Sequence, residues 1–268
     1  MPDKLLDLRK KLIRKSKKRM QQRYAESDVH IIRAVAVLQD LDNTFNLLAE
    51  NTIEWYSAHF PELHQLLKDN GQYLQLVCFL GERKNFTEKK VGETVKEKKK
   101  GKKIAAAARK SMGSPLSKEV LDAIKLLAFN ALNLKQERAL LEKLIEKEMQ
   151  GYAPNTAELA GPILGARLLA AASGLKQLAM MPASTIQLLG AEKALFRHLR
   201  NKNVKGPKYG LIYGHSLVKK MPGKHKGKVA RSLAAKIAIA GRADFFGKRG
   251  GIGEKLQKEL QERIKQLD

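Results

Sequence analysis

The stretch that decides the fold class is SDVHIIRAVAVLQDLDNTFNLLAENTIEW, residues 27–55. Apolar residues recur in it at alternating steps of three and four, which is the spacing of a coiled-coil helix. They are Ile31, Ala34, Leu38, Leu41, Phe45, Leu48 and Trp55, with Thr52 as a polar member of the row. Ser27 can cap the start of this helix, where Asp28 also suits the helix dipole. We expect the coiled-coil or dimerisation seam to be formed by Ile31, Leu38, Leu41, Phe45 and Leu48.

A second stretch with this spacing begins at Ser117 and continues to Ile145, interrupted only at Arg138. Between the two stretches, Pro61 ends the first helix, and a shorter helix is predicted over residues 62–80. Two long heptad helices around a shorter one suggest an antiparallel coiled-coil arm that closes on itself. The same pattern fits part of a dimer seam, so both arrangements stay open. We assign residues 24–150 to this coiled-coil domain.

Residues 81–114 interrupt the coiled-coil pattern as a lysine-rich insertion. Their sequence from Glu82 onward, ERKNFTEKKVGETVKEKKKGKKIAAAARKSMGS, loses the apolar periodicity and is of low complexity. Segments of this kind cannot bury enough apolar surface to stay ordered. A loop of this length inside a domain is usually functional or disordered.

Residues 151–250 are predicted to form a compact helical domain, which makes the whole chain all-α: a coiled-coil helical arm followed by this domain. Gly151–Pro154 marks the boundary. Asn155 with Glu158 resembles a capping box for the first helix. Small residues in the stretch that follows allow helices to approach closely.

Pro182 marks a break in this domain, after which Ser184 or Thr185 can cap the next helix. A further break at Gly206-Pro207 precedes a short apolar run that is the one stretch considered as a strand. The candidate strand is Tyr209–Tyr213. After it we expect a last strong helix at about 227–246 and an amphipathic C-terminal tail within 251–268.

The formal charge of +25 is concentrated in three blocks. Residues 1–23, read as a basic helix or arm, and residues 82–110 each carry a net +8, and residues 197–231 carry +11. Between Lys193 and Ala243 the chain has fourteen Lys and Arg residues and no Asp or Glu. Because Lys and Arg gain affinity by displacing counterions from phosphates, charge segregated in this way indicates a footprint for nucleic acid.

Several classes of function are disfavoured by composition. The single cysteine, Cys78, excludes an intramolecular disulfide and fits a small buried hydrophobe better than a nucleophile, and the histidines lack metal-ligand spacing. Residues 247–255, GKRGGIGEK, fail the phosphate-loop pattern, so we expect no enzyme activity, cofactor or metal.

The sequence also argues against export and membrane insertion. The N-terminus is too charged for a signal peptide, and residues 159–181 contain Pro, Arg and Lys, which disfavours a membrane-spanning helix. We therefore expect a soluble, intracellular protein.

Two stripes of cations are predicted on helices. In GAEKALFRHLR, residues 190–200, Lys193, Arg197 and Arg200 project to one side, and Leu195 and Leu199 project the other way, toward a core. The last strong helix repeats the arrangement. Its cations Lys224, Lys228, Arg231 and Arg242 share one face, and Val229, Leu233, Ile237 and Ala240 the opposite one.

The segment between these helices is rich in Lys, Gly, His and Tyr, which suits close approach to phosphates and stacking on an unpaired base. His215 could contact RNA or be a hydrogen-bonded structural residue. The residues predicted to bind RNA are Lys193, Arg197, His198, Arg200, Lys205, Lys208, Tyr213, His215, Lys219, Lys220, Lys224, Lys228 and Arg231.

Four blocks in fixed order resemble the Nop-domain family, which includes archaeal scaffolds of box C/D guide ribonucleoproteins, nucleolar relatives and a spliceosomal protein. The resemblance covers roughly residues 24–80 and 115–247. The blocks are HFPEL (59–63), ELAGPILGARLLAAASGLKQLAMMPASTIQLLGAEKALFRHL (158–199), PKYGLIYGHS (207–216) and KGKVARSLAAKIAIAGRADFF (226–246).

The resemblance implies recognition of a kink-turn RNA that already carries a small ribosomal-type protein. It places the RNA-contacting helix on Lys193, Arg197 and His198, and the loop that caps the RNA stem on 213–215. Here Gly214 separates the aromatic residue from His215, so the capping residue is left open. Relatives also pair two scaffold copies through the coiled coil.

Family scaffolds usually begin with an α/β domain that docks the 2′-O-methyltransferase fibrillarin, and none precedes Tyr24. Fibrillarin recruitment is therefore left open, and the chain is a trimmed piece, a short paralogue or the partner of a separately encoded domain. The leading hypothesis is a non-catalytic scaffold for guided RNA 2′-O-methylation, in an archaeal cytoplasm or, for a eukaryotic relative, a nucleolus. The alternative is a general RNA- or ribosome-associated helical protein that needs no small kink-turn protein.

Overall fold

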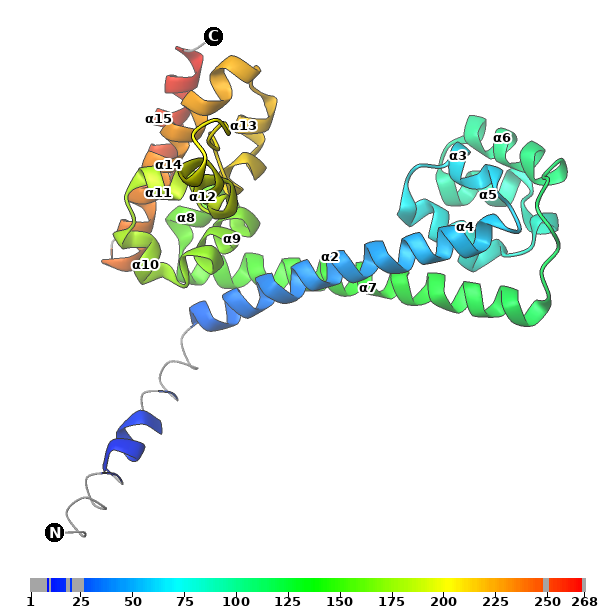
Figure 1. Ribbon diagram of the computed structural model, residues 1–268, viewed down its shortest axis with the longest axis horizontal. Helices are drawn as coiled ribbons and strands as arrows, with labels where there is room; N and C mark the ends of the chain where they lie inside the picture. Colours follow the sequence, from blue (N-terminus) through cyan, green and yellow to red (C-terminus); the bar gives the residue numbers. More distant parts are fainter. Residues whose placement is uncertain (1–8, 10, 18–19, 21–26, 248–250, 267–268) are drawn as a thin grey trace. The chain divides into compact units, whose positions relative to one another are not determined.

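The computed structural model describes residues 9, 11–17, 20, 27–247 and 251–266 (Figure 1). Every regular element in this part of the chain is a helix, which confirms the all-α prediction. The chain divides into two compact units. We call Leu38–Leu141 the middle unit, and Met1–Val37 together with Glu142–Asp268 the C-terminal unit. Of the basic arm at 1–23, the residues that are described are helical and exposed, and the others lie outside the description.

Two long helices, α2 (Ser27–Ser57) and α7 (Lys118–Tyr152), contribute to both units. In the middle unit they lie side by side, with an ion pair between Asp42 and Arg138 (Figure 1). Leu38 is buried, and Phe45 and Leu48 pack against a core that includes Ala128 and Ala131 of α7. The heptad row of α2 is therefore used within the chain, which is the first of the two arrangements left open by the sequence. Leu41 is half-buried, and Ile31, in the C-terminal unit, is buried.

The prediction of a single helix over 62–80 is wrong, because this stretch forms two helices, α3 (Glu62–Leu66) and α4 (Asn70–Leu80). The division occurs at Asp69, whose carboxylate accepts a hydrogen bond from the Gln72 N–H at 2.7 Å. A short acidic side chain that caps the next turn favours a new helix start over a continuous helix. In α4, Cys78 lies half-buried against the core, and burial raises the pKa of its thiol, as suits a packed residue rather than a nucleophile.

The lysine-rich insertion at 81–114 is folded, so the expectation of disorder is wrong. It forms η1 (Arg83–Asn85), α5 (Glu88–Val95) and α6 (Lys98–Arg109). The two helices cross closely, since a Cβ on Gly101 would lie 3.2 Å from the Gly92 Cα. The segment is ordered because its few apolar residues complete a core supplied largely by α2, α4 and α7, which composition alone does not reveal. Those buried residues are Phe86, Val91, Val95, Ile104 and Ala108.

The C-terminal unit is organised around α14 (Gly223–Phe245), which contacts at least five other α-helices. The four apolar residues expected on its inner face, Val229, Leu233, Ile237 and Ala240, are all buried. The helices in contact with α14 are α8 (Pro154–Ala160), α10 (Leu175–Met180), α11 (Ala183–Leu188), α13 (Ser216–Lys220) and α15 (Ile252–Lys265). The predicted amphipathic tail is thus α15, which buries Leu256 and Leu260.

The start of α8 is capped from α14, and the expected pairing of Asn155 with Glu158 is not formed. The buried Asp244 carboxylate accepts hydrogen bonds from the Asn155 and Thr156 N–H groups at 3.0 and 2.9 Å, and from both of their side chains. The Asn155 side chain in turn accepts the Gly253 N–H of α15 at 2.9 Å. A carboxylate at the positive end of a helix is favourable, and this one joins three helices.

Three smaller expectations also change. Pro182 precedes α11, so Ser184 and Thr185 lie inside that helix rather than capping it. The run considered as a strand overlaps the short 3-10 helix η2 (Leu211–Gly214) instead. Helix α14 begins at Gly223, before the expected start. None of the helices in the described part of the chain is long and apolar enough to cross a membrane.

Candidate nucleic-acid interface

Helix α12 (Glu192–Arg200) carries the first predicted stripe of cations. Lys193, Arg197 and Arg200 are exposed and line one surface hollow of about 430 Å³ together with Phe196 and Asn201. The structure therefore brings these three predicted residues together, as their spacing on a helix requires. We call them the α12 stripe.

The apolar side of α12 does not face a core, contrary to the expectation for Leu199. All nine residues of α12 are described, and none is buried. Leu195 is half-buried, but Leu199 is 53% exposed and Phe196 is 58% exposed. An exposed aromatic and an exposed leucine beside three cations make a surface suited to a partner with both apolar and anionic groups.

Both ends of α12 are held by backbone contacts. Before it, Gly190 adopts a positive φ of 85°, and a Cβ at this position would collide with the Leu211 side chain. The end of α11 is joined to the start of η2 by hydrogen bonds from the Gly210 N–H to the Gln187 carbonyl at 2.9 Å and from the Leu211 N–H to the Leu189 carbonyl at 2.8 Å. These contacts fix α12 relative to the loop that precedes η2.

His198 has a structural contact at the other end of α12. It is half-buried, its Nδ1 lies at hydrogen-bonding distance from the Val204 carbonyl, and its ring lies against Gly206. The ring thus holds the loop that follows the helix. This leaves its Nε2 as the nitrogen that could meet a phosphate.

Tyr213 is exposed and stacks on Tyr209, with ring centroids 5.0 Å apart and planes inclined by 10°. The Lys226 Nζ lies 5.1 Å from the Tyr213 ring centroid, within the range of a cation–π contact. A rigid aromatic surface beside a cation is a platform for a terminal or unpaired base. Tyr209 and Lys226 were not predicted as site residues. The sequence feature that points to Tyr209 is its spacing of four residues from Tyr213. This spacing predicts neighbouring rings only if the segment is helical.

His215 makes a hydrogen bond within the chain, as in the structural alternative to RNA contact. Its Nδ1 accepts a hydrogen bond from the Leu217 N–H at 3.3 Å, which caps α13. Burial lowers the pKa of the imidazole. Because burial favours the neutral form, the ring is suited to this internal role.

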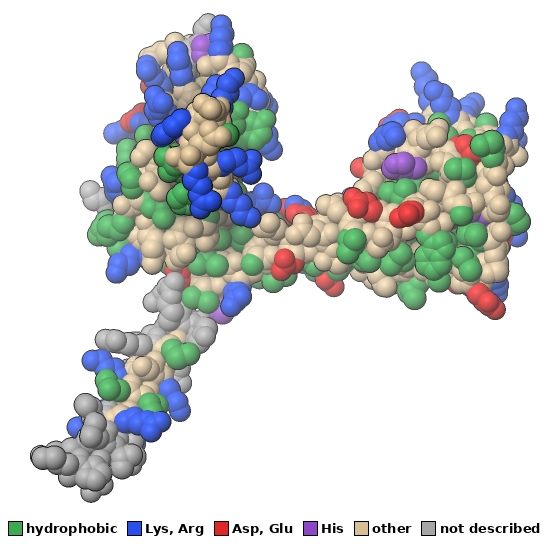
Figure 2. All heavy atoms as spheres, viewed as in Figure 1, with side chains coloured by type: hydrophobic (Ala, Val, Ile, Leu, Met, Phe, Trp, Pro, Cys, Tyr) green, Lys and Arg blue, Asp and Glu red, His purple; other side chains and the backbone are tan. Residues whose placement is uncertain are grey.

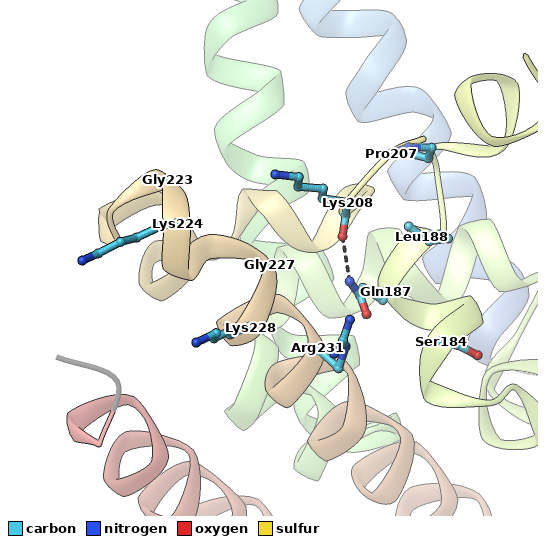
Figure 3. Close-up of a pocket in the computed structure, with 10 residues that line it drawn as sticks. All are labelled: Ser184, Gln187, Leu188, Pro207, Lys208, Gly223, Lys224, Gly227, Lys228 and Arg231. Carbon is cyan, nitrogen blue, oxygen red and sulfur yellow. Dashed lines mark hydrogen bonds between the residues drawn. The ribbon is translucent and has the colours of Figure 1, made fainter. Parts of the chain in front are cut away.

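The second predicted stripe borders a cleft of about 570 Å³, which we call the α14 cleft. Its cations are Lys208, Lys224, Lys228 and Arg231. Figure 3 shows Arg231 pointing toward Gln187, whose side-chain N–H donates to the Lys208 carbonyl at 2.7 Å, while Lys224 and Lys228 extend outward. The other lining residues are Ser184, Leu188, Pro207, Gly223 and Gly227, so the lining has no acidic side chain.

The remaining cations predicted to bind RNA lie elsewhere on this unit. Lys205, in the loop after α12, and Lys219 and Lys220, at the end of α13, are exposed and line neither hollow. Arg242 donates from Nε to the Ala179 carbonyl at 3.1 Å and so joins α14 to α10. Figure 2 shows Lys and Arg side chains gathered over this part of the unit.

Comparison with known families gives one match over most of the chain. Residues 37–266 match the Nop family, described as "snoRNA binding domain, fibrillarin". An uncharacterised NOP5 family protein of Methanocaldococcus jannaschii is 46% identical over 242 residues, which are 90% of this chain and 58% of that protein. Nucleolar protein 58 of Sclerotinia sclerotiorum is 44% identical over 227 residues, 85% of this chain and 40% of the relative. The chain thus spans about half the length of these relatives.

A solved structure has the same fold. It is the crystal structure of a fibrillarin/Nop5p complex, with a TM-score of 0.56 and 25% sequence identity, covering 97% of this chain and 78% of that one. The family match spans both compact units, and it includes the α12 stripe, the tyrosine stack and the α14 cleft. By its sequence and its fold, this chain belongs to the Nop family.

Proposed function

We propose that this chain is a non-catalytic scaffold of a box C/D guide ribonucleoprotein. In this proposal it binds a kink-turn RNA together with the small protein that recognises the kink-turn first, and so supports guided 2′-O-methylation. The main support for the proposal is that the α12 hollow and the α14 cleft are lined by cations and by no acidic side chain, on a unit that also exposes the Tyr213 ring of the tyrosine stack.

The two hollows support different parts of this role. The α14 cleft is lined by four cations and no acid, and it is built on a helix with a buried face, which suits the phosphate backbone of RNA. The α12 stripe adjoins Phe196 and Leu199, which are exposed. A surface that is both cationic and apolar suits a junction of RNA and protein better than RNA alone.

The tyrosine stack supports a stem-capping role for Tyr213. Its ring is 40% exposed, whereas His215 is half-buried and its Nδ1 accepts a hydrogen bond from the Leu217 N–H. We therefore assign the terminal base pair of the RNA stem to Tyr213, with Lys226 beside it.

Ordered assembly tests the proposal. A gel shift on a kink-turn RNA should show weak, salt-sensitive binding by this chain alone and much tighter binding when the small kink-turn protein is present. A matched RNA duplex without the kink-turn is the control and should gain nothing from the small protein. Equal affinity with and without the small protein, at the same salt concentration, would favour the general RNA-binding alternative.

We also propose that two scaffold copies associate through the middle unit. Since Leu38 is buried within the chain, the contact would use apolar residues that α2 and α7 leave exposed, such as Leu47, Trp55, Phe129 and Leu140. Light scattering at tens of micromolar should give a dimer mass, and a 30.0 kDa monomer would contradict the proposal.

Fibrillarin is the methyltransferase that this scaffold is proposed to work with, since the similar Nop5p chain was crystallised with it. Co-elution of nuclease-treated chain and fibrillarin from a sizing column tests whether the residues present here dock the enzyme without RNA. Stoichiometric co-elution would assign docking to the helical units.

A further inference from the structure

The middle unit carries a second concentration of positive charge, separate from the interface described above. Residues 82–114 hold twelve basic and four acidic residues, a net of +8. The rest of the unit, residues 38–81 and 115–141, holds five basic and nine acidic residues, a net of −4. Figure 2 shows Lys and Arg side chains gathered where α5 and α6 lie in Figure 1. The charge is therefore localised on one part of the unit rather than spread for solubility.

Helix α6 carries part of this charge in a row of lysines on its exposed side. Lys99 and Lys103 are one turn apart, and Lys110 follows two turns later, so all three lie on one side of the helix. They are exposed, and they lie opposite the buried side formed by Gly101, Ile104 and Ala108. We call these three residues the lysine row. Its position is fixed because the opposite side of the helix belongs to the core.

The lysine row is not neutralised by any carboxylate in the described part of the chain. Nearby ion pairs are formed by Lys84 with Glu82, by Lys100 with Glu97 at 2.9 Å and by Lys102 with Glu88 at 3.5 Å. Among the described residues, no carboxylate lies within ion-pairing distance of the row. Helix α6 and Lys110 together contain seven basic residues and no acidic one.

The charge is also placed unfavourably for the free chain. Five of these lysines lie in the first six residues of α6, at the positive end of the helix dipole, where cations destabilise a helix. The N-cap residue Glu97 makes no capping hydrogen bond. An anion bound along the row would relieve this repulsion. No aromatic residue occurs in α5 or α6, so a partner would be held by its phosphates rather than by stacked bases.

We propose that the lysine row is a second RNA-binding surface, which contacts the phosphate backbone of a helical RNA without reading its sequence. This inference goes beyond the proposed scaffold function, because it concerns the other compact unit and requires neither a kink-turn nor the small protein. RNA is favoured over an acidic protein because neither α5 nor α6 exposes a large apolar or aromatic side chain that could anchor a peptide: Val91, Val95 and Ile104 are buried.

The test uses the full chain and a fluorescent RNA duplex of about twenty base pairs that lacks a kink-turn. Charge reversal of the row (Lys99→Glu, Lys103→Glu, Lys110→Glu) is compared with reversal of three exposed lysines on α7 (Lys118→Glu, Lys143→Glu, Lys147→Glu), which changes the net charge equally. A third variant, with the row changed to Gln, keeps the helix propensity and guards against misfolding.

We expect the row reversal to weaken duplex binding at least about tenfold and to reduce the slope of log K against log salt by about two to three, since each phosphate contact contributes about 0.9. The Gln variant should change both in the same direction by less, and the α7 control should change little. Equal losses for the row and the control would reduce the effect to net charge and overturn the proposal, as would unchanged binding by the row variants.

Ternary binding to kink-turn RNA and its small protein is measured in parallel. It reports the scaffold function separately, so a row that fails on the duplex leaves the scaffold proposal intact. Conversely, duplex binding that depends on the row stands even if ordered assembly is not observed. A row that binds an acidic protein but no duplex would contradict the assignment to RNA.

Discussion

Helices α12 and α14 carry cations on their outer sides but differ in what lies beneath them. Helix α14 buries nine residues, including Leu233 and Ile237, whereas α12, which is described in full, buries none. The cations of α14 are thus presented on a rigid core element, while α12 is held by the segments at its two ends. The difference suits the two kinds of recognition proposed above: a fixed cationic cleft for RNA, and a surface helix whose exposed apolar residues meet a protein partner.

The largest effect is expected from removing the Asp244 carboxylate, which joins α14 to α8. Asp244→Ala should lower the free energy of unfolding by about 3–5 kcal/mol, because it leaves the buried N–H groups of Asn155 and Thr156 without their acceptor. Chemical denaturation measures this loss. Glu158→Ala is the control on the same helix and should cost little, since Glu158 is exposed. Equal effects would contradict the assignment of the cap to Asp244.

Charge reversal on α12 tests whether its cations contribute to binding without contributing to stability. Lys193→Glu with Arg197→Glu should weaken ternary binding at least about a hundredfold, which is about 2.7 kcal/mol, while the melting temperature stays nearly unchanged. Both residues are exposed and line the hollow on α12. Titration of the ternary complex and thermal melting by circular dichroism give the two values. If the doubly reversed chain unfolds, the stripe is structural.

The tyrosine stack lies between the two helices in sequence and should have a smaller effect. Tyr213→Ala should weaken binding by about 1–3 kcal/mol, the usual contribution of one aromatic stacked on a base. Tyr213→Phe retains the ring and should bind almost normally. His215→Ala should mainly loosen α13, because His215 caps that helix. If His215→Ala weakens RNA binding more than Tyr213→Ala without loss of stability, the stem is capped by His215.

The smallest expected effect separates protein contact from RNA contact. Phe196→Ser with Leu199→Ser should lower affinity several-fold for the ternary complex and leave binding to RNA alone unchanged, because these side chains carry no charge. A matched pair on α14, Lys224→Gln with Lys228→Gln, should weaken both. Loss of RNA-only binding in the α12 serine variant would remove the distinction between the helices.

Helical periodicity predicted much of this molecule. The heptad row of α2 and the two faces of α14 follow from spacing, since a buried face must recur with the helical period. The order of the lysine-rich segment could not be predicted in this way, because Phe86 and Ile104 fill a core formed largely by distant helices. The same reason hides the Asp244 cap, which joins residues 89 positions apart.

The candidate site shows the same limit. The α12 stripe follows from residue spacing, but the exposure of Leu199 does not, because it depends on which helix covers that side. The roles of Tyr209 and His215 depend on the short η2 and α13 helices, which are too brief to give a periodic signal.

In the proposed function, the surface of the C-terminal unit recognises RNA and the small kink-turn protein together. The most direct measurement is the affinity of the chain for kink-turn RNA with and without the small protein, and of the small protein for RNA with and without the chain. Linkage requires that both ratios be equal. We predict a common ratio above about ten, reduced toward one by Phe196→Ser with Leu199→Ser. A ratio of one in the unaltered chain would contradict composite recognition.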